Sequence, residues 1–474
     1  MKEVSSATII SGLFNGILKN KLPRKVLQKQ LDKHIREKIL KNDEYEATES
    51  ARLFRYYAVH AMYTSFLRNY DKGIISKRLI NKVIATLVNS VMLGDNKVHN
   101  SIEKFQDKYN QLPPKFLTIS PTNKCNLKCT GCYASSKASD NKSISWDLLM
   151  KIIEDAYINM GMRFFVVSGG EPLLYRSENK TILDLAKKWN DCFFLMYTNG
   201  TLINKEIASQ MAEVGNITPA ISIEGFTAHT DHRRGNGTFR SIIKAKDQLI
   251  SYSIPFGLSV TATKDNINLL LSENFYDFYF NEFGSTYMWV FHYMPIGREF
   301  TTNLMITPRQ RVELFKIQRK ILIEKKYFVA DFWNSGIISN GCISCGKPKG
   351  YFYINWDGNI MPCVFVPHFN DNIQTLYNSG RNLSDALFSP LFVKGRPWQS
   401  GYKSRNGISM NLLMPCFYRD HYKDFTEIVK SSNAMPENQA AKDALNSHEY
   451  YKDMLNFDEQ LRKISTPIWE EYIT

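Results

Sequence analysis

The strongest constraint on the fold is a change of periodicity near residue 115. From Phe116 onward, short apolar runs alternate with segments long enough to form helices. The six runs are KFLTIS (115–120), FFVVSGG (164–170), FFLMYTNG (193–200), TPAISIEG (218–225), FGLSVTAT (256–263) and YMWVFHYMP (287–295). This alternation predicts an α/β fold with an all-parallel sheet, either an open wound sheet or a partial barrel. In both architectures the reactive side chains lie at the carboxyl ends of the strands.

The segments on either side of this alternation have a different composition. The residues before Pro113-Pro114 are poor in glycine and carry apolar residues at helical spacing. After the last β/α unit, cysteines, glycines and prolines are frequent, and YFYINWDGNIMPC predicts a β-hairpin that turns at Asp357-Gly358. The end of the chain is polar with a helical pattern. We therefore predict a helical extension (1–112), a β/α unit (113–333), a cysteine-containing unit (334–422) and a helical tail (423–474).

The positive charge is concentrated at the N-terminus. The net charge is +14, and residues 1–41 contain ten Lys or Arg against three Asp or Glu. A basic segment of this kind favours an anionic partner. A predicted first helix carries one apolar stripe, which suits either a lipid interface or the protein's own core. Its members are Ile9, Ile10, Leu13, Phe14, Ile17 and Leu18.

The sequence predicts a cytoplasmic protein with reduced cysteines. The apolar stretches near residues 9–18 and 83–93 are shorter than the ~20 residues that a membrane span needs. No small-residue cleavage site precedes the first basic cluster. Reduced cysteines serve as metal ligands or catalysts more often than as disulfides. Peripheral attachment to an anionic membrane surface, through the basic N-terminus, stays open as an alternative.

Three cysteines follow directly after the first predicted strand. Cys125, Cys129 and Cys132 lie in the loop at its carboxyl end. Three thiolates on a 4Fe–4S cluster leave one iron without a protein ligand, and that iron can bind a substrate or a cofactor. The alternatives are a chance grouping and a zinc site that takes a distant fourth ligand.

The Cx3Cx2C spacing resembles the signature of the radical S-adenosylmethionine (radical SAM) superfamily. The resemblance implies a partial (β/α)6 TIM barrel in which the open iron chelates SAM. A donor such as flavodoxin or ferredoxin would reduce the cluster, and SAM would be cleaved to a 5′-deoxyadenosyl radical that abstracts hydrogen from the substrate. The family usually has an aromatic residue before the last cysteine. Here Gly131 stands at that position, and Tyr133 is the candidate replacement contact for adenine.

Further motifs at the strand ends match family elements that bind SAM. The resemblance implies that SGGEP (168–172) holds the amino group, that SIEG (222–225) reaches the ribose and that an arginine pairs with the carboxylate. YTNG (197–200) closes the third strand, and YMPIGR (293–298) closes the sixth near the substrate. The predicted SAM contacts are Gly169, Gly170, Glu171, Ser222, Glu224, Arg234 and Tyr133.

A second cysteine set resembles the start of SPASM domains, which carry auxiliary clusters. This chain lacks the later run of three close cysteines that a full SPASM domain has, so the shorter twitch domain with one auxiliary 4Fe–4S cluster is the better match. The implied ligands are Cys342, Cys345, Cys363 and Cys416. A four-thiolate zinc site is the competing interpretation, and His368 is a possible replacement ligand. Cys192 starts an apolar strand and is expected to be a core thiol.

The substrate is less constrained than the chemistry. Relatives with such an accessory domain mostly modify peptides or proteins, so we expect a maturase-like enzyme with a peptide or protein substrate. The alternative within the enzyme class is modification of lipid acyl carbons at a membrane surface. A non-catalytic iron–sulfur electron carrier would not need the SGGEP element. Nucleic acid ranks last as a partner, because the chain has no basic–aromatic stripe of the kind that single-strand binders use.

Overall fold

The computed structural model describes residues 12, 16, 24–41, 48–402 and 411–473. The apolar stripe of the predicted first helix, Ile9 to Leu18, lies outside these described residues. Among the described helices, none combines the length and the apolar character that crossing a membrane requires.

The centre of the molecule is a sheet with the strand order β11-β9-β8-β1-β2-β3-β4-β5-β6-β7. The strands from β8 through β1 to β7 run parallel to their neighbours. The six predicted strands are β1 (Phe116–Ile119), β2 (Phe164–Val167), β3 (Phe193–Thr198), β4 (Ile217–Ile223), β5 (Gly257–Ala262) and β6 (Tyr287–His292). The prediction of a partial parallel barrel is therefore confirmed. It is extended at its edges by β7 (Val329–Asp331) and β8 (Tyr351–Ile354).

The predicted hairpin extends this sheet. β8 pairs antiparallel with β9 (Asn359–Met361), and Gly358 at the turn has a φ of 80°, a conformation that favours glycine. The other edge of β8 pairs in parallel with β1, so that Phe116 lies opposite Tyr351. On its other edge, β9 pairs antiparallel with β11 (Asp371–Asn372). A separate two-stranded sheet is formed by β10 (His368–Phe369) and β12 (Met435–Pro436). The cysteine-containing segment is thus joined directly to the barrel.

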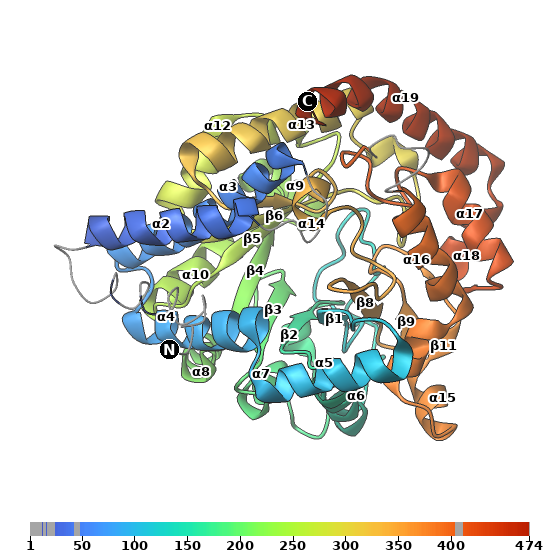
Figure 1. Ribbon diagram of the computed structural model, residues 1–474, viewed down its shortest axis with the longest axis horizontal. Helices are drawn as coiled ribbons and strands as arrows, with labels where there is room; N and C mark the ends of the chain where they lie inside the picture. Colours follow the sequence, from blue (N-terminus) through green and yellow to red (C-terminus); the bar gives the residue numbers. More distant parts are fainter. Residues whose placement is uncertain (1–11, 13–15, 17–23, 42–47, 403–410, 474) are drawn as a thin grey trace.

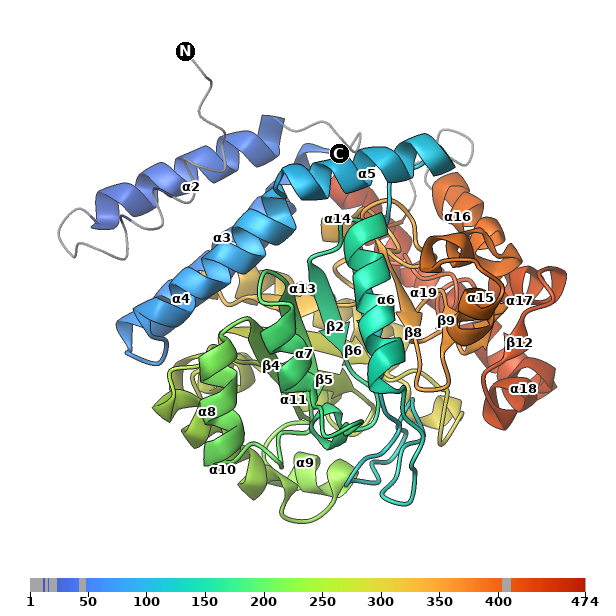
Figure 2. The same cartoon turned by 90° about the horizontal axis from the view of Figure 1, so that it is seen from below.

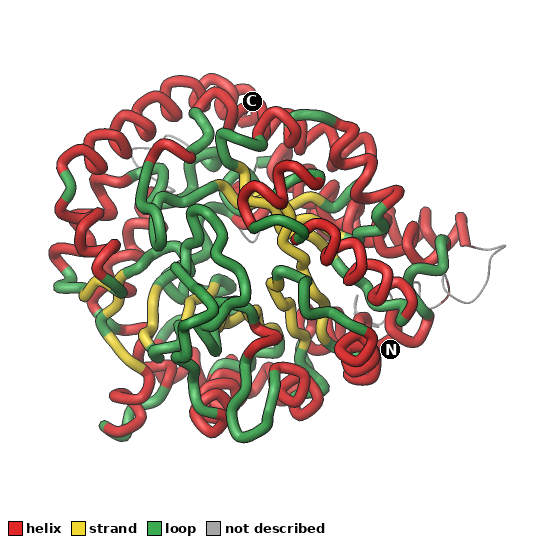
Figure 3. Tube along the Cα trace, turned by 180° about the vertical axis from the view of Figure 1, so that it is seen from behind, coloured by secondary structure: helices red, strands yellow, loops and turns green. Residues whose placement is uncertain are grey.

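Helices surround the strands (Figure 3). Their ends follow from capping residues: Ser145 caps α6 by accepting from the Leu148 N–H, and Thr181 with Asp184 forms a capping box on α7. The helices of the β/α region are α6 (Trp146–Asn159), α7 (Ile182–Lys188), α8 (Lys205–Val214), α9 (Thr227–Arg234), α10 (Thr238–Ser251), α11 (Ile267–Leu270), α12 (Glu273–Asp277) and α13 (Pro308–Lys320).

The N- and C-terminal helices pack outside this barrel (Figures 1 and 2). The buried amide of Asn69 ties α3 to the barrel by donating to the Gly284 carbonyl at 2.8 Å and to the Thr286 hydroxyl at 3.0 Å. The N-terminal helices are α2 (Arg24–Lys41), α3 (Glu49–Asp71), α4 (Lys77–Val83), continued by a π-helical turn (Ile84–Leu93), and α5 (Asn96–Tyr109). The later ones are α14 (Gly336–Ser339), α15 (Ile373–Asn378), α16 (Pro390–Tyr402), α17 (Tyr422–Ser431), α18 (Gln439–Asn446) and α19 (His448–Ile473).

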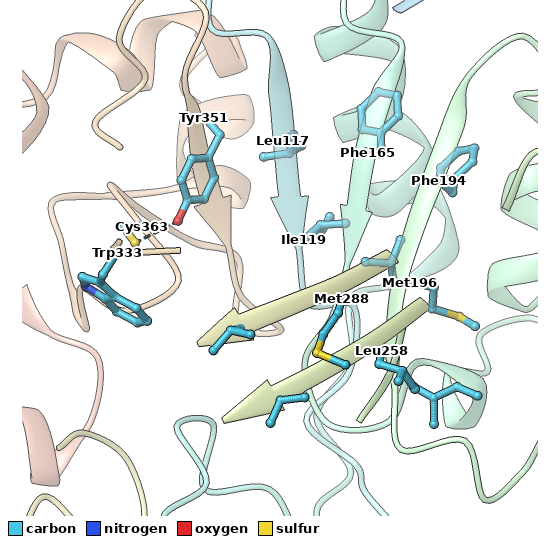
Figure 4. Close-up of a cluster of buried hydrophobic side chains, with 14 of the residues drawn as sticks. Leu117, Ile119, Phe165, Phe194, Met196, Leu258, Met288, Trp333, Tyr351 and Cys363 are labelled. Carbon is cyan, nitrogen blue, oxygen red and sulfur yellow. Dashed lines mark hydrogen bonds between the residues drawn. The ribbon is translucent and has the colours of Figure 1, made fainter. Parts of the chain in front are cut away.

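The core follows the alternation of side chains along the strands. Leu117, Phe165 and Phe194 are fully buried within the large apolar cluster that also includes residues of the surrounding helices (Figure 4). Their strand neighbours Val166 and Leu195 belong to a separate cluster. Because successive side chains of a strand point to opposite faces, this second cluster faces the barrel interior.

Candidate active site and auxiliary cysteine cluster

The three-cysteine loop lies at the carboxyl end of β1, as predicted. Cys125, Cys129 and Cys132 line one cavity of about 260 Å³. Burial raises the pKa of Cys125 to about 12, and burial also raises the pKa of Cys129. The Leu127 N–H donates to the Cys125 sulfur at 3.5 Å. Buried thiols that become thiolates need a compensating positive charge, which metal ions supply, so this donor set fits an iron–sulfur cluster.

The two glycines of SGGEP pack against the cysteine loop. The Gly170 N–H donates to the Thr122 carbonyl at 2.9 Å, and the Glu171 N–H donates to the Lys124 carbonyl at 2.8 Å. A Cβ on Gly170 would lie 2.2 Å from the Lys124 carbonyl oxygen, and one on Gly169 would lie 2.6 Å from the Thr122 carbonyl oxygen. Glycine is therefore required here because the backbone approaches the loop that carries Cys125. Both glycines also line the cavity.

The Glu171 carboxylate is completely buried between the second and third strands. It accepts hydrogen bonds from the Thr198 hydroxyl at 2.7 Å, the Asn199 N–H at 2.8 Å and the Leu173 N–H at 3.1 Å. Burial raises its pKa, and these three donors oppose that effect by favouring the charged form. Glu171 thus links the predicted SGGEP and YTNG elements.

Two adjacent arginines converge on Glu224. Glu224 Oε1 accepts from Arg233 Nη1 at 2.5 Å and from Arg234 Nη2 at 2.6 Å, whereas its buried Oε2 has no hydrogen-bond partner in the described part of the chain. Arg234 Nη1 lies 4.0 Å from the Cys129 sulfur. Both arginines line the cavity, so Arg234 reaches the predicted place. Sequence analysis missed Arg233, although its position directly beside Arg234 was a signal.

Arg298 of the YMPIGR motif binds the backbone of the three-cysteine loop. Its guanidinium donates to the carbonyls of Cys129 and Ser136, and its backbone N–H donates to the Cys132 carbonyl at 3.0 Å. The preceding Gly297 has a φ of 78°, and a Cβ there would lie 2.2 Å from the Tyr133 carbonyl oxygen. The motif was predicted to lie near the substrate. Its Tyr293 and Met294 line the cavity, and its Arg298 holds the loop.

The remaining predicted contacts, Tyr133 and Ser222, also line the cavity. The Tyr133 hydroxyl donates to Ser168 Oγ at 3.3 Å, and its ring meets Phe365 edge-on at 6.0 Å. The Ser222 hydroxyl lies 3.2 Å from that of Ser259 on β5. The structure therefore brings all seven predicted SAM contacts to the cysteine end of the barrel, with Glu171 and Glu224 in buried hydrogen-bond networks.

The second cysteine set forms a buried group next to the first cavity. Cys342, Cys363 and Cys416 line a smaller cavity of about 40 Å³. Cys345 is completely buried, and the Ser344 hydroxyl lies 3.1 Å from the Cys342 sulfur and 3.5 Å from the Cys345 sulfur. Burial raises the pKa of Cys345 and of Cys363 to about 12, and neighbouring thiols add to each shift. The four sulfurs thus influence one another electrostatically.

Hydrogen-bond donors surround these sulfurs. The Phe365 N–H lies 3.4 Å from the Cys363 sulfur, and the Arg419 N–H lies 3.4 Å from the Cys416 sulfur. The Tyr351 hydroxyl lies 2.8 Å from the Cys363 sulfur (Figure 4). Donors of this kind stabilise thiolate ligands and suit an iron–sulfur centre. No described group of three or more His, Cys, Asp or Glu side chains is spaced for a single metal ion.

The possible replacement ligand His368 and the predicted core thiol Cys192 both lie outside these two cavities. His368 does not line the smaller cavity, and its ring meets Phe425 edge-on at 5.8 Å. Cys192 is completely buried in the apolar core around β3.

Comparison with known proteins agrees with this geometry. Residues 119–279 match the radical SAM superfamily. An uncharacterized protein of Methanocaldococcus jannaschii, MJ0907, is 32% identical over 163 residues, which are 33% of this chain and 56% of that protein. The chain thus spans little more than half of that relative. Mycofactocin maturase MftC of Mycobacterium ulcerans is 27% identical over 302 residues, covering 60% of this chain and 78% of MftC.

A solved structure shows the same fold. Streptococcus suis SuiB, crystallised with its precursor peptide SuiA, superposes with a TM-score of 0.52 at 18% identity, covering 67% of this chain and 74% of SuiB. Among the relatives found by sequence, AdoMet-dependent heme synthase of Methanosarcina barkeri is 24% identical over 289 residues, which are 55% of this chain and 80% of that protein. Residues 119–279 therefore form a radical SAM domain, and members of that superfamily bind a 4Fe–4S cluster and SAM.

Proposed function

We propose that this protein uses SAM and a 4Fe–4S cluster to abstract hydrogen from a peptide or protein substrate. The observation that carries the proposal is the convergence of three thiols, two arginines and a glycine-lined strand end on one cavity. When bound, the cluster and SAM supply a 5′-deoxyadenosyl radical, and the electron comes from an external donor such as flavodoxin or ferredoxin.

The residues around the cavity have distinct roles in this proposal. Cys125, Cys129 and Cys132 hold the cluster and leave one iron open for SAM. The backbone of Gly169 and Gly170, which lines the cavity, would hold the amino end of SAM, and the buried Glu171 carboxylate would support this wall from behind. Arg234 lies beside Cys129 and offers its guanidinium to the SAM carboxylate. Of the remaining predicted SAM contacts, Ser222 and Tyr133 line the same cavity, whereas Glu224 is buried and binds the two arginines that line it.

The second cysteine set serves a different purpose. We assign Cys342, Cys345, Cys363 and Cys416 to one fully ligated auxiliary 4Fe–4S cluster, which can exchange electrons but leaves no iron open. Four residues, Phe332, Ile343, Tyr351 and Phe365, line both the large cavity and the smaller one. A single layer of side chains thus separates the substrate space from the auxiliary site, which suits electron transfer between the two.

The peptide assignment rests on two similarities. One relative is named a maturase, and a protein of the same fold was crystallised with a precursor peptide. The lipid alternative rested on the basic N-terminus, whose apolar stripe lies outside the described residues, and on the aromatic residues of the helical extension. Of these, Phe54, Tyr56 and Tyr63 are buried in the protein's own core. An electron carrier would have no use for the glycine-lined wall and the paired arginines beside the three-cysteine loop.

The test is production of 5′-deoxyadenosine by anaerobically reconstituted, reduced protein. We expect SAM cleavage in the wild type, no cleavage in Cys125→Ala, Cys129→Ala or Cys132→Ala, and retained cleavage in the core variant Cys192→Ala. Cleavage that persists in a loop-cysteine variant contradicts the assignment. A mixed peptide library should raise the rate above the uncoupled level. If deuterium instead appears in 5′-deoxyadenosine from a lipid extract with deuterated acyl chains, the substrate is a lipid.

A further inference from the structure

The inside of the barrel is open and lined by aromatic side chains. Phe116, Phe164, Tyr197, Trp289 and Phe291 all line the large cavity and are partly accessible, although they lie in central strands. Their strand neighbours on the opposite face are buried. A closed β/α barrel fills this space with packed side chains. Here the lumen is a continuation of the SAM cavity.

The lumen reaches the far ends of the strands. Phe116 and Phe164 are the first residues of β1 and β2, they pair in register, and their rings lie 5.4 Å apart. The Tyr351 ring stacks on Phe116 at 5.0 Å. Since a strand rises by about 3.3 Å per residue, this aromatic floor lies about 10 Å below the carboxyl end of β1. A side chain that enters from the cysteine end therefore has room to insert lengthwise.

The lumen contains little charge. Of the described residues that line the cavity, Arg233 and Arg234 are the permanently charged ones, and they lie at the cysteine end beside Cys129. A charged group that moved deeper would lose its hydration without a partner, which is costly. Aromatic walls instead favour an aromatic guest, because ring pairs gain from edge-to-face and offset contacts. The lumen thus selects for an uncharged aromatic group.

Tyr197 brings a hydroxyl group into the aromatic lumen. The Tyr197 hydroxyl makes no hydrogen bond within the described part of the chain, whereas the buried hydroxyl of Tyr287 in the same sheet lies 2.9 Å from the Thr218 hydroxyl. The Tyr197 ring meets Phe291 edge-on at 5.6 Å. Burial raises the pKa of Tyr197 well above its usual range, so the hydroxyl keeps its proton and stays a donor. A guest that fills the cavity displaces the water around this hydroxyl, so the guest itself has to accept its hydrogen bond.

We propose that the barrel lumen receives an aromatic side chain of the substrate and that Tyr197 is a specificity-determining residue, whose hydroxyl donates to a polar atom on that side chain. This inference rests on the proposed peptide substrate and adds which kind of residue the enzyme acts on. It also explains why the lumen is open at a depth where a purely structural barrel would be packed.

The test measures binding rather than turnover. Reconstituted protein with SAM is dialysed anaerobically against N-acetyl-L-tyrosinamide, N-acetyl-L-phenylalaninamide, N-acetyl-L-leucinamide or octanoate, and bound probe is quantified by mass spectrometry. We expect both aromatic amides to bind at least about tenfold more tightly than the leucine amide. Tyr197→Phe should weaken tyrosinamide binding about three- to tenfold, as expected for one lost hydrogen bond, and leave phenylalaninamide binding unchanged.

The matched control is Tyr276→Phe, since the Tyr276 hydroxyl is buried and donates to the Leu270 carbonyl at 2.9 Å, away from the cavity lining. It should change neither amide. Equal or tighter binding of the leucine amide or octanoate, or no binding of any probe, overturns the aromatic assignment. An unchanged tyrosinamide affinity in Tyr197→Phe overturns the role of Tyr197. SAM binding is measured in the same dialysis chambers. A failure of the proposed function itself therefore shows separately, as a loss of SAM binding.

Discussion

Replacing Gly395 by alanine should selectively destroy the auxiliary cluster. Gly395 is a buried residue of α16, and a Cβ built there would lie 2.5 Å from the Cys345 sulfur. Ordinary van der Waals contacts of such atoms begin near 3.4 Å, so the sulfur or the helix has to move by nearly an ångström. A free thiol can rotate away, whereas a sulfur bound to iron cannot do so without breaking the cluster geometry.

The expected cost can be compared with the helix gain. Alanine in place of glycine stabilises a helix interior by about 1 kcal/mol. Overpacking a buried site costs about 1–3 kcal/mol. The two nearly cancel in the global free energy of unfolding, so the fold should persist within about 2 kcal/mol of wild type. The Cys345 sulfur is still displaced, and this displacement affects only the auxiliary cysteine cluster.

The assay is iron and sulfide content per chain after anaerobic reconstitution, with electron paramagnetic resonance of the reduced centres. Two 4Fe–4S clusters give about eight irons per chain, and Gly395→Ala should retain about four while still cleaving SAM. The matched control is Gly401→Ala in the same helix, where a Cβ meets nothing within 4 Å. If Gly395→Ala keeps a full complement of iron with an unchanged spectrum, Cys345 is not a ligand.

Three other changes test separate parts of the site. Arg298→Ala removes the guanidinium that holds two carbonyls of the three-cysteine loop, so iron at the SAM cluster should fall by at least half while Arg298→Lys keeps more of it. Tyr351→Phe removes a hydrogen-bond donor from the Cys363 sulfur. It should lower the midpoint potential of the auxiliary cluster by about 60 mV in a redox titration, which is a tenfold change in the reduction equilibrium. The control Tyr353→Phe on the same strand, whose hydroxyl binds Ser120, should leave this potential unchanged. Burial raises the pKa of Asp458 from 3.8 to about 8. The unfolded chain loses this proton near its ordinary pKa of 3.8, whereas the folded chain keeps it up to about pH 8. The free energy of unfolding therefore falls as the pH rises through this window. Asp458→Asn should flatten this fall in melting temperature between pH 5.5 and 8; an unchanged pH profile would refute the assigned protonation.

Local patterns in the sequence predicted the parts of the site that depend on neighbouring residues. The Cx3Cx2C loop, the SGGEP turn and the Asp357-Gly358 hairpin each lie within a few residues, so their composition was enough to place them. The pairing of β8 with β1 joins residues more than two hundred positions apart, and the sequence carries no local signal for that register. The role of Arg298 was missed for the same reason, because its partners lie in a loop far away in the chain.

The departure at Gly131 shows how a long-range contact can replace a local motif. The family pattern has an aromatic residue directly before the last cysteine, and this chain has glycine with a φ of 63°. A Cβ at that position would lie 2.5 Å from the Tyr293 ring, which comes from the end of β6 and lines the same cavity. The aromatic surface beside Cys132 is therefore present, but another strand supplies it. Tyr133, the replacement expected from the sequence, lines the same cavity, where its hydroxyl donates to Ser168 and its ring meets Phe365 edge-on. A sequence motif records which residue is adjacent in the chain, whereas the cavity depends only on which ring is adjacent in space.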